Sequence, residues 1–180
     1  LTFVNNTDDG DIIFQSDNGS GGVATYFAID GGAVLNKFYK DVKHLDSVKS
    51  TFGDSGDLQL YHNGTDSFLL NTEGDLEIIN FADDKDIIFK SDDGSGGVTA
   101  YITLDGSAAE ITLHRTTKVV DSMYIAAGTG TDMYMVHDGS NSYLQNVTGD
   151  LYIQNGANDK DVILRSDDGS GGQTAYITLD

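Results

Sequence analysis

The amino-acid sequence predicts an all-β fold, an elongated repeat fibre of short strands resembling a β-solenoid or β-prism shaft. The first observation is a repeat: DIIFKSDDGSGGVTAYITL at 86–104 has related copies at 11–29 and 161–179. The second is its spacing, because the copies start at residues 11, 86 and 161, an interval of 75 residues each time. The third is local pattern. Short runs of alternating apolar and polar residues are separated by Gly, Asn and Asp, and the chain contains no Pro.

The repeats define the domain organisation. Residues 76–105 align without a gap to 151–180, with 22 identities in 30 positions. We therefore predict one β-repeat over 1–75, a second over 76–150 and the start of a third over 151–180. Residues 33–56 are the most divergent part of the first repeat. Because the chain begins with Leu1 and stops inside a repeat, we expect it to be a fragment of a longer polypeptide.

The first element of each repeat is predicted to be a β-hairpin, with a tight β-arc as the alternative. In the second copy, the apolar runs 87–89 and 100–104 flank a Gly-rich link whose residues tolerate positive φ. Strict alternation places Ala100, Ile102 and Leu104 on one face of the second strand, with Tyr101 and Thr103 on the other.

The divergent region 33–56 is open to two interpretations. Leu35, Phe38, Val42 and Leu45 have the spacing of an amphipathic helix. The aligned residues 108–126 are rich in Thr, Val and Ile, which favours strands. Since equal spacing implies one shared backbone, we predict β-structure for both.

A second motif occupies 56–79 and returns at 131–154. Asn63-Gly64 and Asp138-Gly139 are strong hairpin signals between its apolar runs. Together the motifs predict about seven short strands per repeat, with a turn roughly every ten residues.

Composition narrows the functional class. The net charge of −19, from 29 acidic and 10 basic residues, opposes binding to nucleic acid or to an anionic membrane. The absence of Cys excludes disulfides and cysteine zinc sites. No apolar run reaches the roughly 20 residues of a membrane-spanning helix, so no membrane insertion is expected.

Short strands with one apolar face must cover that face with neighbouring units or with other chains. We therefore expect an elongated acidic rod, and threefold association of chains is a common way to close such thin sheets. Two stretches also resemble known proteins. GDLQLYHNGTDSFLLNTEGDLEI at 56–78 and SDDGSGGVTAYITLDG at 91–106 resemble repeats of tail-fibre-like structural proteins of marine bacteriophages, such as those infecting cyanobacteria.

This resemblance covers most of the chain except about 33–56. It implies an extracellular virion protein: the shaft or spacer of an intertwined, homotrimeric tail fibre or spike that supports host-cell attachment. Expected partners are further copies of the chain and other virion tail proteins, with a host receptor contacted through a part outside this chain. No residue here matches a receptor-binding motif. The alternative is a secreted or cell-surface β-repeat adhesin or filament subunit that binds carbohydrate or Ca²⁺.

Three groups of residues are candidates for chemistry. Clustered carboxylates in the Gly-rich links suit Ca²⁺, but neither an EF-hand nor an RTX repeat matches, and the pattern favours a solvated turn. His62 and His137 of the second motif could meet their counterparts on a trimer axis and hold a metal ion. Alternatively, each forms a hydrogen bond at a strand end near a turn. These weak metal candidates are Asp92, Asp93, Asp167, Asp168, His62 and His137.

Acidic pairs before the first hairpin resemble the carboxylates of a glycosidase, which would suit a polysaccharide-degrading spike. They are Asp83, Asp84 and Asp86, and Asp159 with Asp161. Because they recur with the repeat beside Lys85 or Lys160, we interpret them as exposed turns. No G-x-S-x-G motif or phosphate-binding loop occurs. We therefore expect no enzymatic activity and no cofactor, and we expect Tyr101, Tyr143, Tyr152 and Tyr176 to pack across strands rather than stack on sugars.

Overall fold

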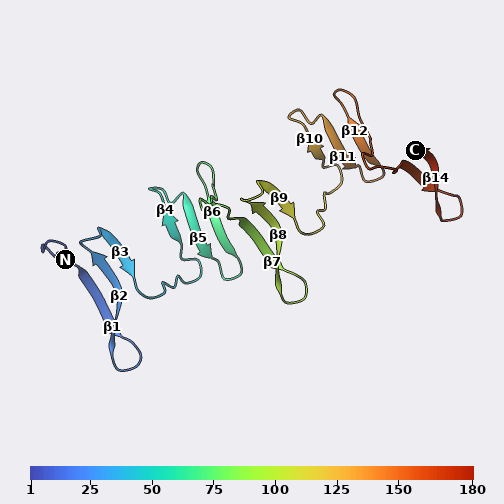
Figure 1. Cartoon of the computed structure of the whole chain (residues 1–180). Coiled ribbons are helices and arrows are strands. Elements are labelled where there is room, and N and C mark those ends of the chain that lie inside the picture. The colour runs from blue at the N-terminus through green and yellow to red at the C-terminus, as the bar shows by residue number, and fades with distance from the viewer. The chain divides into compact units, whose positions relative to one another are not determined.

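The computed structural model describes all 180 residues and contains fourteen β-strands and no helix (Figure 1). The chain is therefore all-β, as predicted, and no helix is present that could cross a membrane. The strands of the first repeat are β1 (Ile12–Asp17), β2 (Val23–Asp30), β3 (Leu35–Phe38), β4 (Ser50–Phe52), β5 (Leu58–His62) and β6 (Ser67–Asn71). Those of the second are β7 (Ile87–Asp92), β8 (Val98–Asp105), β9 (Glu110–Leu113), β10 (Ile125–Ala127), β11 (Met133–His137) and β12 (Ser142–Asn146). The third contains β13 (Val162–Asp167) and β14 (Gln173–Leu179).

The backbone repeats as closely as the sequence does. Every strand from β7 to β12 has the bounds of its counterpart in the first repeat plus 75 residues. Residues at positive φ recur with the same interval, as at Asp9, Asp84 and Asp159. The β interpretation of the divergent region is confirmed, because β3 and β4 lie where a helix was the alternative. The predicted count of seven strands per repeat is wrong: each complete repeat has six.

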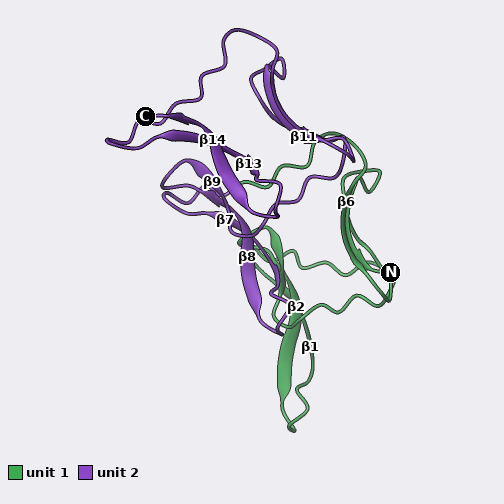
Figure 2. Ribbon diagram, turned by 90° about the vertical axis from the view of Figure 1, so that its right-hand side faces the viewer, with its two compact units in different colours: residues 1–79 green, residues 80–180 purple.

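All five sheets are small, antiparallel and open. Their orders are β1-β2-β3, β4-β5-β6, β7-β8-β9, β10-β11-β12 and β13-β14, so consecutive strands always pair. The chain divides into two compact units, 1–79 and 80–180 (Figure 2). Within each unit, strands contact only strands of their own sheet. Most large apolar side chains of these sheets are also exposed, so no sheet face is closely covered inside a unit.

The first element is the predicted hairpin, but it carries a β-bulge that the alternation did not reveal. Phe89 pairs with Ile102 while its neighbour Lys90 pairs with Ala100, which leaves Tyr101 as the extra residue of β8. Because an inserted residue shifts the pleat by one, Ala100 lies on the face opposite to Ile102. The expectation that Ala100 shares a face with Ile102 and Leu104 is thus corrected. The same bulge occurs in β1-β2 and β13-β14.

The chain has almost no interior of its own. Only Ala28 (2% exposed) and Thr103 (8% exposed) are buried, and they occupy the same position of successive repeats. The accessible surface of the chain is 14866 Å². A folded monomer of this mass, 19.2 kDa, ordinarily exposes about 8,400 Å². The excess is far larger than loops alone produce, and much of it is apolar.

Candidate functional site

The carboxylates of the Gly-rich links accept hydrogen bonds from residues of the same turn. Asp93 Oδ1 accepts hydrogen bonds from Ser95 N (2.8 Å), Ser95 Oγ (2.7 Å) and Gly97 N (3.1 Å). Asp92 Oδ1 accepts one from Gly94 N (2.7 Å). Asp167 and Asp168 repeat this arrangement in the third copy. These residues therefore close the hairpin as Asx-turns, which satisfy backbone donors that would otherwise be unpaired.

The first copy shows that this role requires an oxygen acceptor rather than a charge. There Asn18 Oδ1 accepts the same three bonds, from Ser20 N, Ser20 Oγ and Gly22 N. In the other copies the hydroxyl of Ser95 or Ser170 and the adjoining amides lower the pKa of Asp93 and Asp168 below 3.8. No group of three or more His, Asp or Glu side chains is arranged to hold a metal ion. The links thus have a structural use that explains their acidic residues.

His62 and His137 lie at the ends of β5 and β11, as the second motif predicts. The ring Nδ1 of His62 shares a hydrogen bond of 3.2 Å with Ser67 Oγ on the paired strand. His137 shares one of 3.1 Å with Ser142 Oγ. Each His is therefore a cross-strand partner of a Ser beside a hairpin turn, and each is exposed.

The acidic residues before the first hairpin form a corner between the chain entering that hairpin and the turn that follows it. Asp86 Oδ1 accepts a hydrogen bond from Gly106 N (3.1 Å), and Asp11 Oδ1 accepts one from Gly31 N (3.1 Å). Asp84 and Asp159 adopt positive φ of 54°, which is typical of turn residues. None of these carboxylates lines a hollow of the surface.

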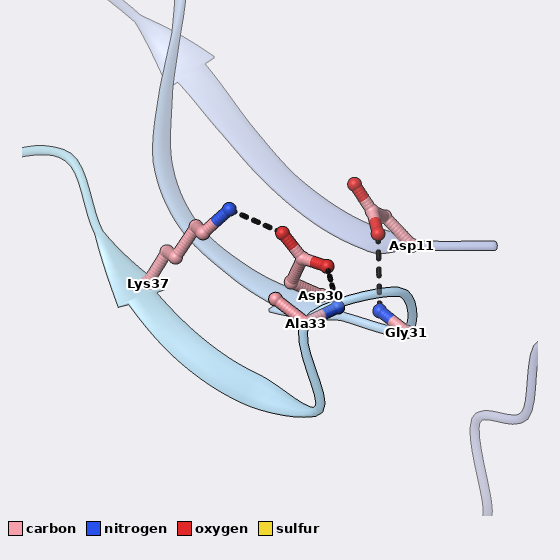
Figure 3. A network of polar contacts seen from close by, with 5 residues as sticks. All are labelled: Asp11, Asp30, Gly31, Ala33 and Lys37. Carbon is pink, nitrogen blue, oxygen red and sulfur yellow. Dashed lines mark hydrogen bonds and ion pairs between the residues drawn. The ribbon is translucent and has the colours of Figure 1, made fainter. Parts of the chain in front are cut away.

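Figure 3 shows the corner of the first repeat. The carboxylate of Asp30 accepts a hydrogen bond from Ala33 N (2.7 Å) and forms an ion pair with Lys37 of β3. The bond from Lys37 and the bond from Ala33 lower the pKa of Asp30, and the same contact raises the pKa of Lys37. In the second repeat Thr112 replaces the Lys, and Asp105 instead accepts bonds from Ser107 and Ala108. The corner is thus kept while its charge pattern changes.

The tyrosines serve the fold. The bulged Tyr101 donates its hydroxyl hydrogen to the Asp92 carbonyl oxygen (2.8 Å), and Tyr26 and Tyr176 donate likewise to Asp17 (2.9 Å) and Asp167 (3.1 Å). Tyr143 donates to Asp138 Oδ2 (3.0 Å), and this bond raises the pKa of Tyr143. Bonds from the amides of Asn141 and Ser140, and from Tyr143, lower the pKa of Asp138. Tyr152 has only a long contact to Asp150, at 3.5 Å.

The most prominent surface feature is a set of exposed apolar side chains on the sheets. Alternation in the sequence did not show which of these side chains lie next to each other. Three of the four three-stranded sheets carry on one face a row of large apolar side chains, one from each strand in register, which we call an apolar row. In the sheet β4-β5-β6, Ser50 takes the place of one member beside Leu60 and Leu69. In the first sheet the row is Phe14, Phe27 and Phe38, with ring centroids 5.5 and 5.1 Å apart. The later rows are Phe89, Ile102 and Leu113, and Ile125, Met135 and Leu144. Every member of these later rows is at least 38% exposed.

The apolar row of β10-β11-β12 lines an open hollow of about 490 Å³. Met123, Val119 and Leu144 contribute to its wall, and His137 and Ser142 stand at its edge. The polar side chains that line it are His137, Ser142 and Tyr143, and each is bonded within its own hairpin rather than free to orient a small-molecule substrate. Its chemistry suits burial of apolar side chains.

No protein-family model, curated protein or solved structure matches this chain.

Proposed function

We propose that the chain is a structural virion protein, a shaft or spacer segment of a phage tail fibre or spike that supports host-cell attachment as an intertwined homotrimer. The observation that carries the proposal is a backbone repeated at 75-residue intervals whose apolar rows remain exposed in the single chain. The resemblance of residues 56–78 and 91–106 to phage tail-fibre repeats supports the assignment to a virion.

The exposed surface area supports association of several chains. The single chain exposes roughly 6,400 Å² more than an ordinary folded monomer of its mass. Obligate protein interfaces bury about 2,000–5,000 Å² or more in total and are more apolar than other interfaces. Mutual coverage of the apolar rows by three chains accounts for an excess of this size, and threefold association is one way to close thin sheets.

The function is mechanical in this proposal. Turn carboxylates, histidines and tyrosines are engaged in local bonds that repeat from copy to copy, which suits a regular rod. A rod of this kind transmits position to a binding tip, and receptor contact is assigned to a part outside this chain. We propose no catalytic role.

Light scattering after gel filtration tests the assembly. A mass three times 19.2 kDa is expected. Leu113→Lys places a charge in an apolar row and should reduce the mass to one chain. Thr112→Lys is the matched control, because Thr112 precedes Leu113 on β9 and the first repeat has Lys37 at that position. A wild-type mass of one chain at all concentrations would refute the homotrimer.

Immunogold labelling tests the virion assignment. Antibodies against the chain should decorate the tail appendages of the virions that carry it. Labelling of a cell-surface filament, with none on virions, would favour the adhesin alternative.

A further inference from the structure

The short segments that connect one repeat to the next have the sequence of strands but form none. They are residues 1–4, 76–79 and 151–154, which we call the connecting segments. Leu76 and Ile78 alternate with Glu77, and Leu151 and Ile153 alternate with Tyr152, which is the period of a strand. Figure 1 shows the segment between β12 and β13 without a strand arrow. A strand at this position would bring the six strands of each repeat to the count of about seven that the sequence predicts.

The backbone of the connecting segments is unpaired within its own unit. Residues 76–79 and 151–154 contain no turn, no bend and no positive φ. No backbone amide or carbonyl of 151–154 forms a hydrogen bond within the unit 80–180, and none of 76–79 does so within the unit 1–79. Since an unpaired backbone without turns exposes a row of donors and acceptors, it is a template for pairing with another strand.

Both ends of the segment in the second unit are held in place. On the N-terminal side, Asn146 Nδ2 donates to the carbonyl oxygens of Thr148 (3.1 Å) and Gly149 (2.8 Å). On the C-terminal side, Asn155 Nδ2 donates to the Asp161 carbonyl oxygen (3.0 Å), and Asn155 Oδ1 accepts from Ala157 N (3.0 Å). A segment anchored at both ends loses less conformational entropy when it pairs.

The same anchors recur around residues 76–79. Asn71 Nδ2 donates to the carbonyl oxygens of Glu73 and Gly74, both at 2.9 Å. Asn80 Nδ2 donates to the Asp86 carbonyl oxygen (3.0 Å). The chain therefore fixes the ends of the segment each time it occurs between two repeats, while leaving the segment itself without a partner.

The side chains of the segment add an apolar incentive to pair. Leu76, Ile78 and Ile79 are 48%, 57% and 58% exposed, and Leu151 and Ile153 are 44% and 61% exposed. Glu77 is the single charged residue among positions 76–79, and 151–154 has none. The acidic residues nearest to the segments are Asp75 and Asp150, which directly precede them, so charge repulsion between copies acts at the ends of the segments and at Glu77.

The spacing identifies the partner. A partner that pairs with every connecting segment must present a matching strand edge at each 75-residue repeat. A second copy of this chain has that period by construction, and its unpaired edges and exposed area are those already described. A partner of unrelated sequence would need to match the same interval independently.

We propose that the connecting segments 76–79 and 151–154 are intermolecular strands, each completing a β-ladder with a second copy of the chain. The inference deepens the proposed function and rests on its multi-chain assembly. In such an assembly the apolar rows of different copies cover one another, while the connecting segments join the copies through backbone hydrogen bonds.

Hydrogen exchange with peptide-level mass spectrometry, combined with light scattering on the same sample, tests the proposal. The alternate amides of 76–79 and of 151–154 that point toward the partner strand are expected to exchange at least about 100-fold more slowly than in an unfolded chain, as those of paired strands do. Slow exchange in a particle of several chains supports the proposal. Fast exchange in a particle of several chains overturns it and leaves the proposed fibre standing. A one-chain mass overturns both, whatever the exchange rate.

Proline substitutions separate backbone pairing from side-chain burial. Since neighbouring amides of a strand point to opposite sides, we use two variants, Glu77→Pro with Tyr152→Pro, and Ile78→Pro with Ile153→Pro. The Ala substitutions at the same positions are the matched controls, because they keep the amides. At least one Pro variant should lose the slow exchange at both segments while its Ala control retains it. Pro variants that behave like their Ala controls would overturn the proposal.

Discussion

In each complete repeat, the turn that follows the first hairpin lies against the chain that enters this hairpin. We expect this contact to depend on one glycine. A Cβ atom at Gly106 would lie 2.5 Å from the carbonyl oxygen of Lys85, a backbone atom that cannot rotate away. The Gly106 amide also donates to Asp86 Oδ1. Gly106→Ala must therefore displace the backbone and weaken that bond. Overpacking of this kind costs about 1–3 kcal/mol.

Two other glycines provide matched controls for the same substitution. Gly94 has a φ of +82° with nothing within 4 Å of its Cβ position, so Gly94→Ala costs about 1–2 kcal/mol from backbone strain alone. Gly156 has neither a positive φ nor a close neighbour. Gly156→Ala should therefore stabilise the chain by about 0.4–1 kcal/mol, because it restricts the unfolded state.

Thermal unfolding followed by circular dichroism is the assay, at one fixed protein concentration because assembly makes the Tm concentration-dependent. A change of 1 kcal/mol shifts the Tm of a protein of this size by about 2–4 °C. Gly106→Ala should therefore melt about 4–8 °C below wild type for a cost near 2 kcal/mol, and Gly156→Ala should melt slightly above it. A Gly106→Ala protein as stable as Gly156→Ala would refute the close approach of Gly106 to Lys85.

Three further predictions concern the hairpin link. Because bonds from Ser95 and Gly97 hold the pKa of Asp93 below 3.8, its contribution to stability is full above that pH and is lost as pH falls through the lowered pKa. Asp93→Asn should keep the turn, as Asn18 does, and an acid titration should show a smaller loss of stability below pH 3.8; an unchanged acid profile would contradict this. Tyr101→Phe removes the bond to the Asp92 carbonyl and should cost about 0.5–1.5 kcal/mol in urea unfolding, and no loss would mean that solvent replaces the bond. Excess EDTA should leave the Tm unchanged, because the link carboxylates bind their own backbone, whereas a large decrease would favour a Ca²⁺-dependent filament.

Much of the fold follows from the repeat and from local pattern. Apolar alternation and the Asn-Gly and Asp-Gly turns locate the hairpin of β5 and β6 and that of β11 and β12. The alignment of 33–56 with 108–126 decides between helix and strand correctly, since a shared interval requires a shared backbone. The bulge at Tyr101 could not be predicted, because β8 keeps its alternation through the inserted residue and only the pairing with β7 reveals it.

The candidate site shows a different limit. Sequence reasoning selected Asp92, Asp93 and His62 because these residue types bind metals, and the structure shows each of them bonded to a neighbour in its own turn or hairpin. Asn80 and Gly106, which hold the corner, were not singled out. Their recurrence 75 residues away, at Asn155 and Gly31, is the signal that could have found them.

The disagreement over the seventh strand shows what a single chain leaves unspecified. Residues 76–79 have the composition and period of a strand. Alternation alone cannot distinguish a strand that pairs within its own chain from one that pairs with another chain. To form a β-ladder, a segment needs an unpaired strand edge that lies beside it. Within each unit, the strands of a sheet contact only one another, so no such edge is offered to residues 76–79. If a partner copy supplies that edge, the sequence-based count of seven applies to the assembled protein, and the six strands of each repeat describe one chain of it. The exchange rates of residues 76–79 and 151–154 in the assembled protein decide between these two counts.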